Sequence, residues 1–137
     1  MIGSILSRYE LLDVLGDAED AAWKARDLRH GRPVRLRVLP GPGTGPGIRQ
    51  ETAAGAPLDR LRGLVHPNLC SLDDAGAAEG HLYVAWAWAD GETLEERLRR
   101  GPFGPEDAAD LAAQTAAGLT AAHSRGIVHG CLEPECI

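Results

Sequence analysis

The first part of the chain alternates hydrophobic and polar residues with the period of β-strands. Residues 9–15 (YELLDVL) predict a strand that ends at Gly16, and residues 21–27 predict a second strand that pairs back against it as a hairpin. A turn over residues 29–32 then leads into a third strand. This strand alternates aliphatic residues with arginines: Val34, Arg35, Leu36, Arg37, Val38. It is therefore expected to have one apolar and one basic face.

A short helix and two further strands are expected next. The helix is predicted near Pro57–Val65, with Leu58, Leu61 and Val65 on one side. The strands are predicted at about Leu69–Asp73 and Leu82–Ala87, joined by a turn that contains glycine. The predicted sheet therefore has five strands and one intervening helix.

The hydrophobic period changes to that of a helix in the last third of the chain. Thr93 and Glu96 have the spacing of a capping box, which opens a short helix that stops at Gly101. A longer helix is predicted from Pro105 to about His123, with Glu106 and Asp107 at its positive N-terminal end. Strands followed by helices predict the α+β class.

Composition and charge exclude several function classes. The 137 residues are 44% hydrophobic and 25% charged, which is typical of a globular protein and not of a disordered tail. The net charge is −6 and only Lys24 among the 14 basic residues is a lysine, so we expect no nucleic-acid binding. The longest apolar run, Leu82–Ala89, is far shorter than the ~20 residues of a membrane-spanning helix. No secretory leader is recognisable, and three cysteines fit a reducing interior, so a cytoplasmic location is expected.

Six segments, in this order, resemble the first half of a bacterial serine/threonine protein kinase domain. They are Arg8–Leu12, Trp23–Asp27, Gly31–Pro40, His66–Leu69, Asp90–Leu94 and His123–Ile137. The resemblance implies a kinase-like N-lobe, with a five-stranded antiparallel sheet and one helix, followed by the first helices of the C-lobe. It divides the chain into an N-terminal leader (1–8), the N-lobe (9–89), and the hinge with a truncated start of the C-lobe (90–137).

The resemblance also implies a degenerate nucleotide site. Its expected residues are Gly16, Ala22, Arg35, Arg37 and Trp86. Gly16 is followed by three acidic residues within Asp17–Asp20, where the family has further glycines that close over phosphates. Arg37 takes the position of the phosphate-binding lysine, and Arg35 takes that of a small residue beneath the adenine.

Several interpretations of these residues remain open. Arg35 and Arg37 either pair with the acidic hairpin and plug the cleft, or point to solvent on a shifted edge strand. The acidic residues after Gly16 either repel a bound polyanion or form a solvated hairpin tip. Lys24 is either a surface residue of the second strand or a relocated phosphate ligand. Trp86 and its neighbour Trp88 either pack in the core, or Trp86 narrows the adenine site.

The helix glutamate that holds the family's lysine has no clear counterpart. Ungapped alignment back from His66 places Pro57 at its position, and Glu51 reaches that position only if several residues are deleted.

The segment that resembles the catalytic loop departs from the family at each chemical position. Cys131 stands at the position of the general base, Glu133 at that of a phosphate-facing lysine, and Cys136 at that of the metal-binding asparagine. No catalytic residue is intact under this alignment. His129, Cys131 and Cys136 have a spacing that matches no familiar zinc pattern, so no metal site is predicted. Cys131 is not expected to be a reactive nucleophile, because glutamates and no cation follow it.

The sequence therefore predicts a pseudokinase-like domain that acts, if at all, through a protein partner. The expected docking surface is the apolar face of the 105–123 helix, and such a face would bind a hydrophobic dye or promote self-association. No cofactor is predicted, although weak ATP binding remains open. One alternative is the front part of an active kinase whose remaining sequence is missing. Another is an unstable piece with no retained role.

Overall fold

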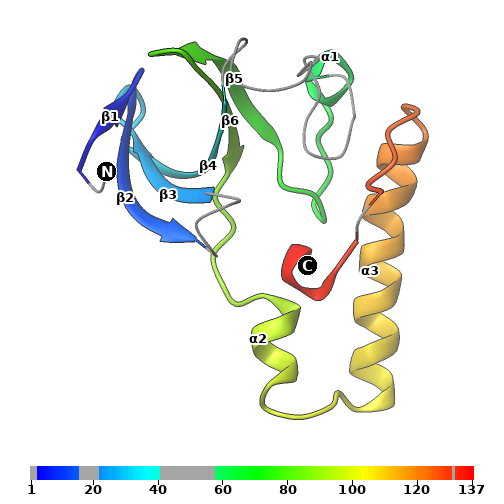
Figure 1. Ribbon diagram of the computed structural model, residues 1–137. Helices are drawn as coiled ribbons and strands as arrows, with labels where there is room; N and C mark the ends of the chain where they lie inside the picture. Colours follow the sequence, from blue (N-terminus) through cyan, green and yellow to red (C-terminus); the bar gives the residue numbers. More distant parts are fainter. Residues whose placement is uncertain (1–2, 16–21, 41–57, 131) are drawn as a thin grey trace. The chain divides into compact units, whose positions relative to one another are not determined.

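The computed structural model describes residues 3–15, 22–40, 58–130 and 132–137 (Figure 1). These residues form two compact units. The sheet unit consists of residues 3–15, 22–40 and 71–88, and the helical unit consists of residues 58–70, 89–130 and 132–137. The sequence had placed all of residues 9–89 in one lobe, whereas residues 58–70 make their contacts with the helical unit.

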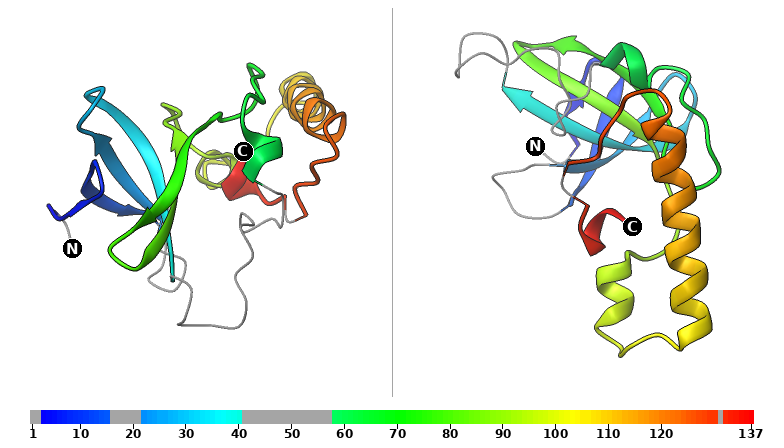
Figure 2. Two further views of the ribbon diagram at one scale, coloured as in Figure 1. Left: turned by 90° about the horizontal axis from the view of Figure 1, so that it is seen from above. Right: turned by 90° about the vertical axis from the view of Figure 1, so that its right-hand side faces the viewer.

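The sheet unit is an antiparallel sheet of six strands in the order β1-β2-β3-β4-β6-β5. Its strands are β1 (Ile5–Leu6), β2 (Tyr9–Leu15), β3 (Ala22–Asp27), β4 (Arg32–Pro40), β5 (Leu72–Ala78) and β6 (His81–Ala87). Figure 2 shows that the sheet curls strongly, so that β2 and β5 face each other across its hollow. The predicted β2, β3, β4 and β6 are confirmed: β2 has the expected bounds, and the others differ by one or two residues at an end.

The core of the sheet unit lies inside this curl. Its buried members are Leu6, Tyr9, Leu11, Trp23, Ala25, Val34, Leu36, Tyr83 and Ala85. Val34 and Leu36 are fully buried, as the alternation along β4 predicted. The rings of Tyr9 and Tyr83 meet edge to face, with centroids 5.6 Å apart. The aromatic residues therefore fill the centre of an otherwise aliphatic core.

A short first strand corrects the prediction of an N-terminal leader over residues 1–8. Ile5 and Leu6 pair with Glu10 and Tyr9 of β2, and Leu6 is buried in the core. The backbone N–H of Leu11 also donates to the carbonyl of Ser4. The sheet consequently has six strands and not five.

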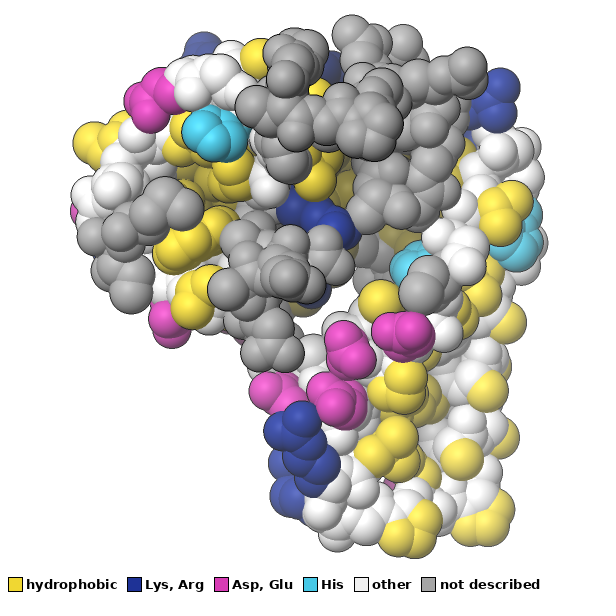
Figure 3. Space-filling model, in the orientation of Figure 1, with side chains coloured by type: hydrophobic (Ala, Val, Ile, Leu, Met, Phe, Trp, Pro, Cys, Tyr) yellow, Lys and Arg dark blue, Asp and Glu magenta, His cyan; other side chains and the backbone are white. Residues whose placement is uncertain are grey.

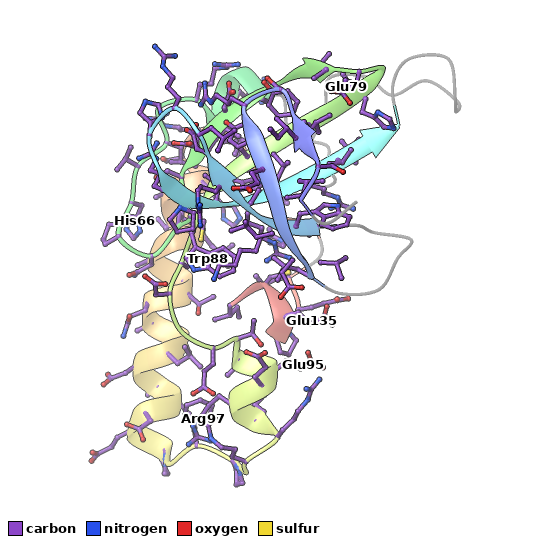
Figure 4. The ribbon with its side chains drawn as sticks, turned by 90° about the vertical axis from the view of Figure 1, so that its left-hand side faces the viewer. His66, Glu79, Trp88, Glu95, Arg97 and Glu135 are labelled. Carbon is purple, nitrogen blue, oxygen red and sulfur yellow. The ribbon has the colours of Figure 1, made fainter. Side chains whose placement is uncertain are left out.

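The strand predicted at Leu69–Asp73 is displaced, because β5 runs from Leu72 to Ala78. Its sequence, LDDAGAA, has low β-propensity, which is why the pattern indicated a turn there. Packing overrides this preference. A Cβ on Gly76 would lie 2.8 Å from the Tyr83 hydroxyl, so the Tyr83 side chain occupies the space of a missing side chain. The actual turn is formed by Glu79 and Gly80, and Glu79 is labelled in Figure 4.

The helical unit contains α1 (Leu58–Leu61), α2 (Leu94–Leu98), α3 (Pro105–His123) and the 3-10 turn η2 (Pro134–Cys136). The predicted capping box of α2 is confirmed. The Glu96 backbone N–H donates to Thr93 Oγ1 at 3.2 Å, and the Thr93 N–H donates to Glu96 Oε2 at 2.8 Å. The bounds predicted for α3 are also confirmed.

The helix predicted over residues 57–65 is shorter than expected. α1 ends at Leu61, and Gly63 follows with a φ of 74°. This left-handed residue redirects the chain, so that Leu64 is buried and Val65 is 79% exposed. The prediction that Val65 lies on the packed side was therefore wrong, and Pro57 lies outside the described residues.

Candidate functional site

The two arginines of β4 lie on the face of the sheet opposite the core. Arg35 is in register with Lys24 on β3 and with Trp86 on β6. Arg37 is in register with Ala22 and Val84. Residues directly opposite each other in antiparallel strands share a face, so these side chains form two adjacent rows. Arg35 is exposed and Arg37 is half-buried.

This arrangement excludes one of the two interpretations of Arg35 and Arg37. β4 is not an edge strand, because it pairs with β3 on one side and β6 on the other. The expectation of a shifted edge strand was therefore wrong, although Arg35 is exposed as that interpretation required. Pairing with the hairpin after Gly16 stays a prediction, because residues 16–21 lie outside the described part of the chain.

Lys24 is not a freely solvated surface residue, and its role as a relocated phosphate ligand stays a prediction. It is half-buried, and its ammonium nitrogen lies 4.7 Å from the centroid of the Trp88 ring. Like charges directly opposite each other on neighbouring strands repel, and Arg35 is the residue opposite Lys24. The indole face offers the ammonium a favourable cation–π contact instead. Figure 4 labels Trp88 where the chain leaves the sheet.

Trp86 is not a member of the sheet core. It is half-buried on the arginine face, in register with Arg35 and with Leu72 of β5. The fully packed tryptophan is Trp23, which is 6% exposed and which the sequence did not single out. The interpretation of Trp86 as core packing was therefore wrong. The remaining interpretation, that it narrows a nucleotide site, stays a prediction.

A buried carboxylate at the end of β3 was missed by the sequence analysis. Asp27 is fully buried and ion-paired with Arg8, with 3.2 Å between Arg8 Nε and Asp27 Oδ1. His30 Nδ1 lies 2.7 Å from Asp27 Oδ2, and the Arg29 backbone N–H donates to Oδ1 at 2.9 Å. The signal was an aspartate at a strand end with a turn histidine three residues later.

The pKa of Asp27 reflects a balance between burial and these contacts. Burial alone favours the neutral acid, but the hydrogen bonds with His30 and the Arg29 backbone, together with Arg8, outweigh it and lower the pKa of the Asp27 carboxyl. Burial and the nearby Asp74 carboxylate raise the pKa of Tyr9 well above its ordinary value. Both shifts are explained by contacts within the sheet unit.

The loop His66–Leu69 is anchored on α3 within the helical unit. Asn68 Nδ2 donates to the carbonyl oxygen of Gln114 at 2.9 Å, and its backbone N–H donates to His66 Nδ1 at 3.1 Å. A Cβ on Gly118 would lie 2.9 Å from the Asn68 carbonyl oxygen. Glycine is thus required for this close approach of loop and helix. His66 is labelled on this loop in Figure 4.

The last segment of the helical unit contains the remaining predicted site residues. His129 is half-buried, whereas Glu133 and Cys136 are exposed, and Cys136 is a free thiol. Cys131 lies outside the described residues. Within the described ranges, no three of the His, Cys, Asp and Glu side chains are close enough together to hold a metal ion.

The predicted site residues that the structure describes belong to two different units. Ala22, Arg35, Arg37 and Trp86 share one face of the sheet unit, whereas Glu133 and Cys136 belong to the helical unit. Gly16 and Cys131 lie outside the described residues, as does the partner-glutamate candidate Glu51. The described groups on this face of the sheet unit supply positive charge and aromatic surface.

Known proteins similar to this chain are protein kinases. The chain is 30% identical to the serine/threonine-protein kinase PknD of Mycobacterium tuberculosis over 138 residues, which cover 99% of the chain and 21% of PknD. It is 32% identical to the rat calcium/calmodulin-dependent protein kinase type 1B, covering 96% of the chain and 38% of that kinase. PrkC of Bacillus subtilis is 28% identical over the full chain and 22% of its own length.

The fold comparison agrees with these relatives. The crystal structure of the PknI kinase domain of Mycobacterium tuberculosis superposes with a TM-score of 0.80 at 19% identity, covering 98% of this chain and 56% of that domain. No family model matches the chain. The chain is a homologue of serine/threonine protein kinases. It has the fold of a kinase N-lobe followed by the first helices of the C-lobe, as the sequence predicted.

This kinase homologue covers 21% of the length of PknD, 22% of PrkC and 38% of the rat kinase. None of the described helices is both long and apolar enough to cross a membrane. The assignment of Arg37, Glu133 and Cys136 to particular catalytic positions still rests on the sequence resemblance.

Proposed function

We propose that this kinase homologue is catalytically inactive and acts in the cytoplasm through binding to another protein. The observation that carries the proposal is the set of residues at the aligned chemical positions. Cys131 replaces the general base, and a thiol near its ordinary pKa is an uncharged substitute for a carboxylate that orients a hydroxyl. Glu133 replaces a phosphate-facing cation, which reverses the sign of the charge that the transition state requires.

The two arginines of β4 support the proposal that the chain does not bind a nucleotide. Where the family has a small residue beneath the adenine, Arg35 is exposed and in register with Trp86, so two large side chains share that row. Arg37 retains positive charge but has a planar guanidinium in place of a compact ammonium. We infer that the side chains of Arg35 and Trp86 leave no room for a nucleotide base between them.

Magnesium and ATP are the groups that the fold family implies, and the residues present do not fit them. The metal-binding asparagine is replaced by Cys136, whose thiol is a soft ligand, whereas Mg²⁺ prefers oxygen. No described cluster of carboxylates stands in for it. We therefore derive no phosphoryl-transfer step for this chain.

The protein-binding part of the proposal rests on α3. Ala108, Ala112 and Ala116 are exposed along one side of this helix, and Leu111 and Leu119 are only half-buried. We infer that this partly exposed apolar face is the interaction site. Figure 3 shows hydrophobic side chains (yellow) along α3. The chain should therefore bind a hydrophobic dye, and a cooperatively melting monomer without dye binding would count against this part of the proposal.

Thermal-shift titration with ATP, with and without Mg²⁺, tests the nucleotide part. A ligand that binds only the folded state raises the melting temperature, because it adds about 2.7 kcal/mol to the free energy of unfolding at a concentration of one hundred times Kd. We expect no rise for the wild type. The paired variant Arg35→Ala should show whether the guanidinium is the obstacle, and Arg26→Ala, which removes an exposed cation paired with Glu10, is the matched control. A clear rise for the wild type would overturn the proposal of a blocked site.

A second candidate is the N-terminal part of an active protein kinase that transfers phosphate from ATP to serine or threonine of protein substrates. The observation that favours it is the short span of this chain on kinases such as PknD, of which it covers 21%. Translation of the DNA that follows codon 137 discriminates between the candidates. An Asp-Phe-Gly-type metal motif in frame would favour the active kinase, and its absence would favour the inactive domain.

A further inference from the structure

We draw no further inference here: the strongest candidate, the basic surface patch of Arg60, Arg62 and Arg125 where α1 meets the end of α3, carries none because nothing in the structure shows what covers it.

Discussion

The hydroxyl of Tyr9 donates to the carboxylate of Asp74 over 3.2 Å, although β3, β4 and β6 lie between their strands in the sheet. The Tyr83 hydroxyl reaches the same carboxylate oxygen at 3.3 Å, and Arg8 lies 3.6 Å from it. Four residues from three parts of the chain thus meet at one oxygen. The curl of the sheet is closed by this polar cluster in addition to the apolar core.

Removal of the Asp74 carboxylate should destabilise the sheet unit. Asp74→Ala leaves two phenolic hydroxyls without their acceptor and removes one of the two carboxylates that Arg8 contacts, and we expect a loss of about 1–3 kcal/mol in the free energy of unfolding. Denaturant unfolding measures this change. Asp13→Ala is the control, since the Asp13 side chain is exposed and accepts only from the adjacent Val14 N–H. Equal losses in both variants would show that the cluster does not close the sheet.

The lowered pKa of Asp27 makes a prediction for acid stability. A carboxyl whose pKa is lower in the folded state stabilises the fold above its unfolded pKa of about 3.9, and this stabilisation disappears as the pH falls through the folded pKa. Stability should therefore decrease with acidification below about pH 4. Asp27→Asn should be less stable at neutral pH and should lose less on acidification. Parallel pH profiles for wild type and variant would contradict this assignment.

Gly118 provides a test in which packing and helix propensity have opposite signs. Propensity alone predicts that Gly118→Ala stabilises α3 by about 1 kcal/mol. The new Cβ would lie 2.9 Å from the Asn68 carbonyl oxygen, so we expect a net destabilisation of about 1–3 kcal/mol. Thermal unfolding with Ala117→Gly as the control, on the exposed side of α3, measures it. If Gly118→Ala were more stable than the wild type, the loop that contains Asn68 would have to move away from α3 without cost, which would contradict the prediction.

The parts of the fold that the sequence predicted are those in which local pattern and packing agree. The alternation around Val34 and Leu36 determines which face of β4 is buried, and the capping residues Thr93 and Glu96 determine where α2 begins. β5 was misplaced because its packing involves the neighbouring strand, where the side chain of Tyr83 lies against Gly76. No local pattern contains that contact.

The candidate site shows the same limit. The sequence predicted that Arg35 and Arg37 share a face, because residues two apart in a strand do so. It could not predict that Lys24 lies over Trp88 or that Arg8 pairs with buried Asp27, since both contacts join segments distant in sequence. Long-range partners of charged side chains depend on the curl of the sheet, which the period of the pattern does not encode.

The central claim, that this kinase homologue has lost phosphoryl transfer, is tested most directly with ATP labelled in its γ-phosphate. The purified chain is incubated with labelled ATP, Mg²⁺ and a general protein acceptor, beside an active kinase and a blank without protein. The account predicts no label on the acceptor above the blank, for the wild type and for Cys131→Ala alike. Label transferred by the wild type and lost in Cys131→Ala would contradict it.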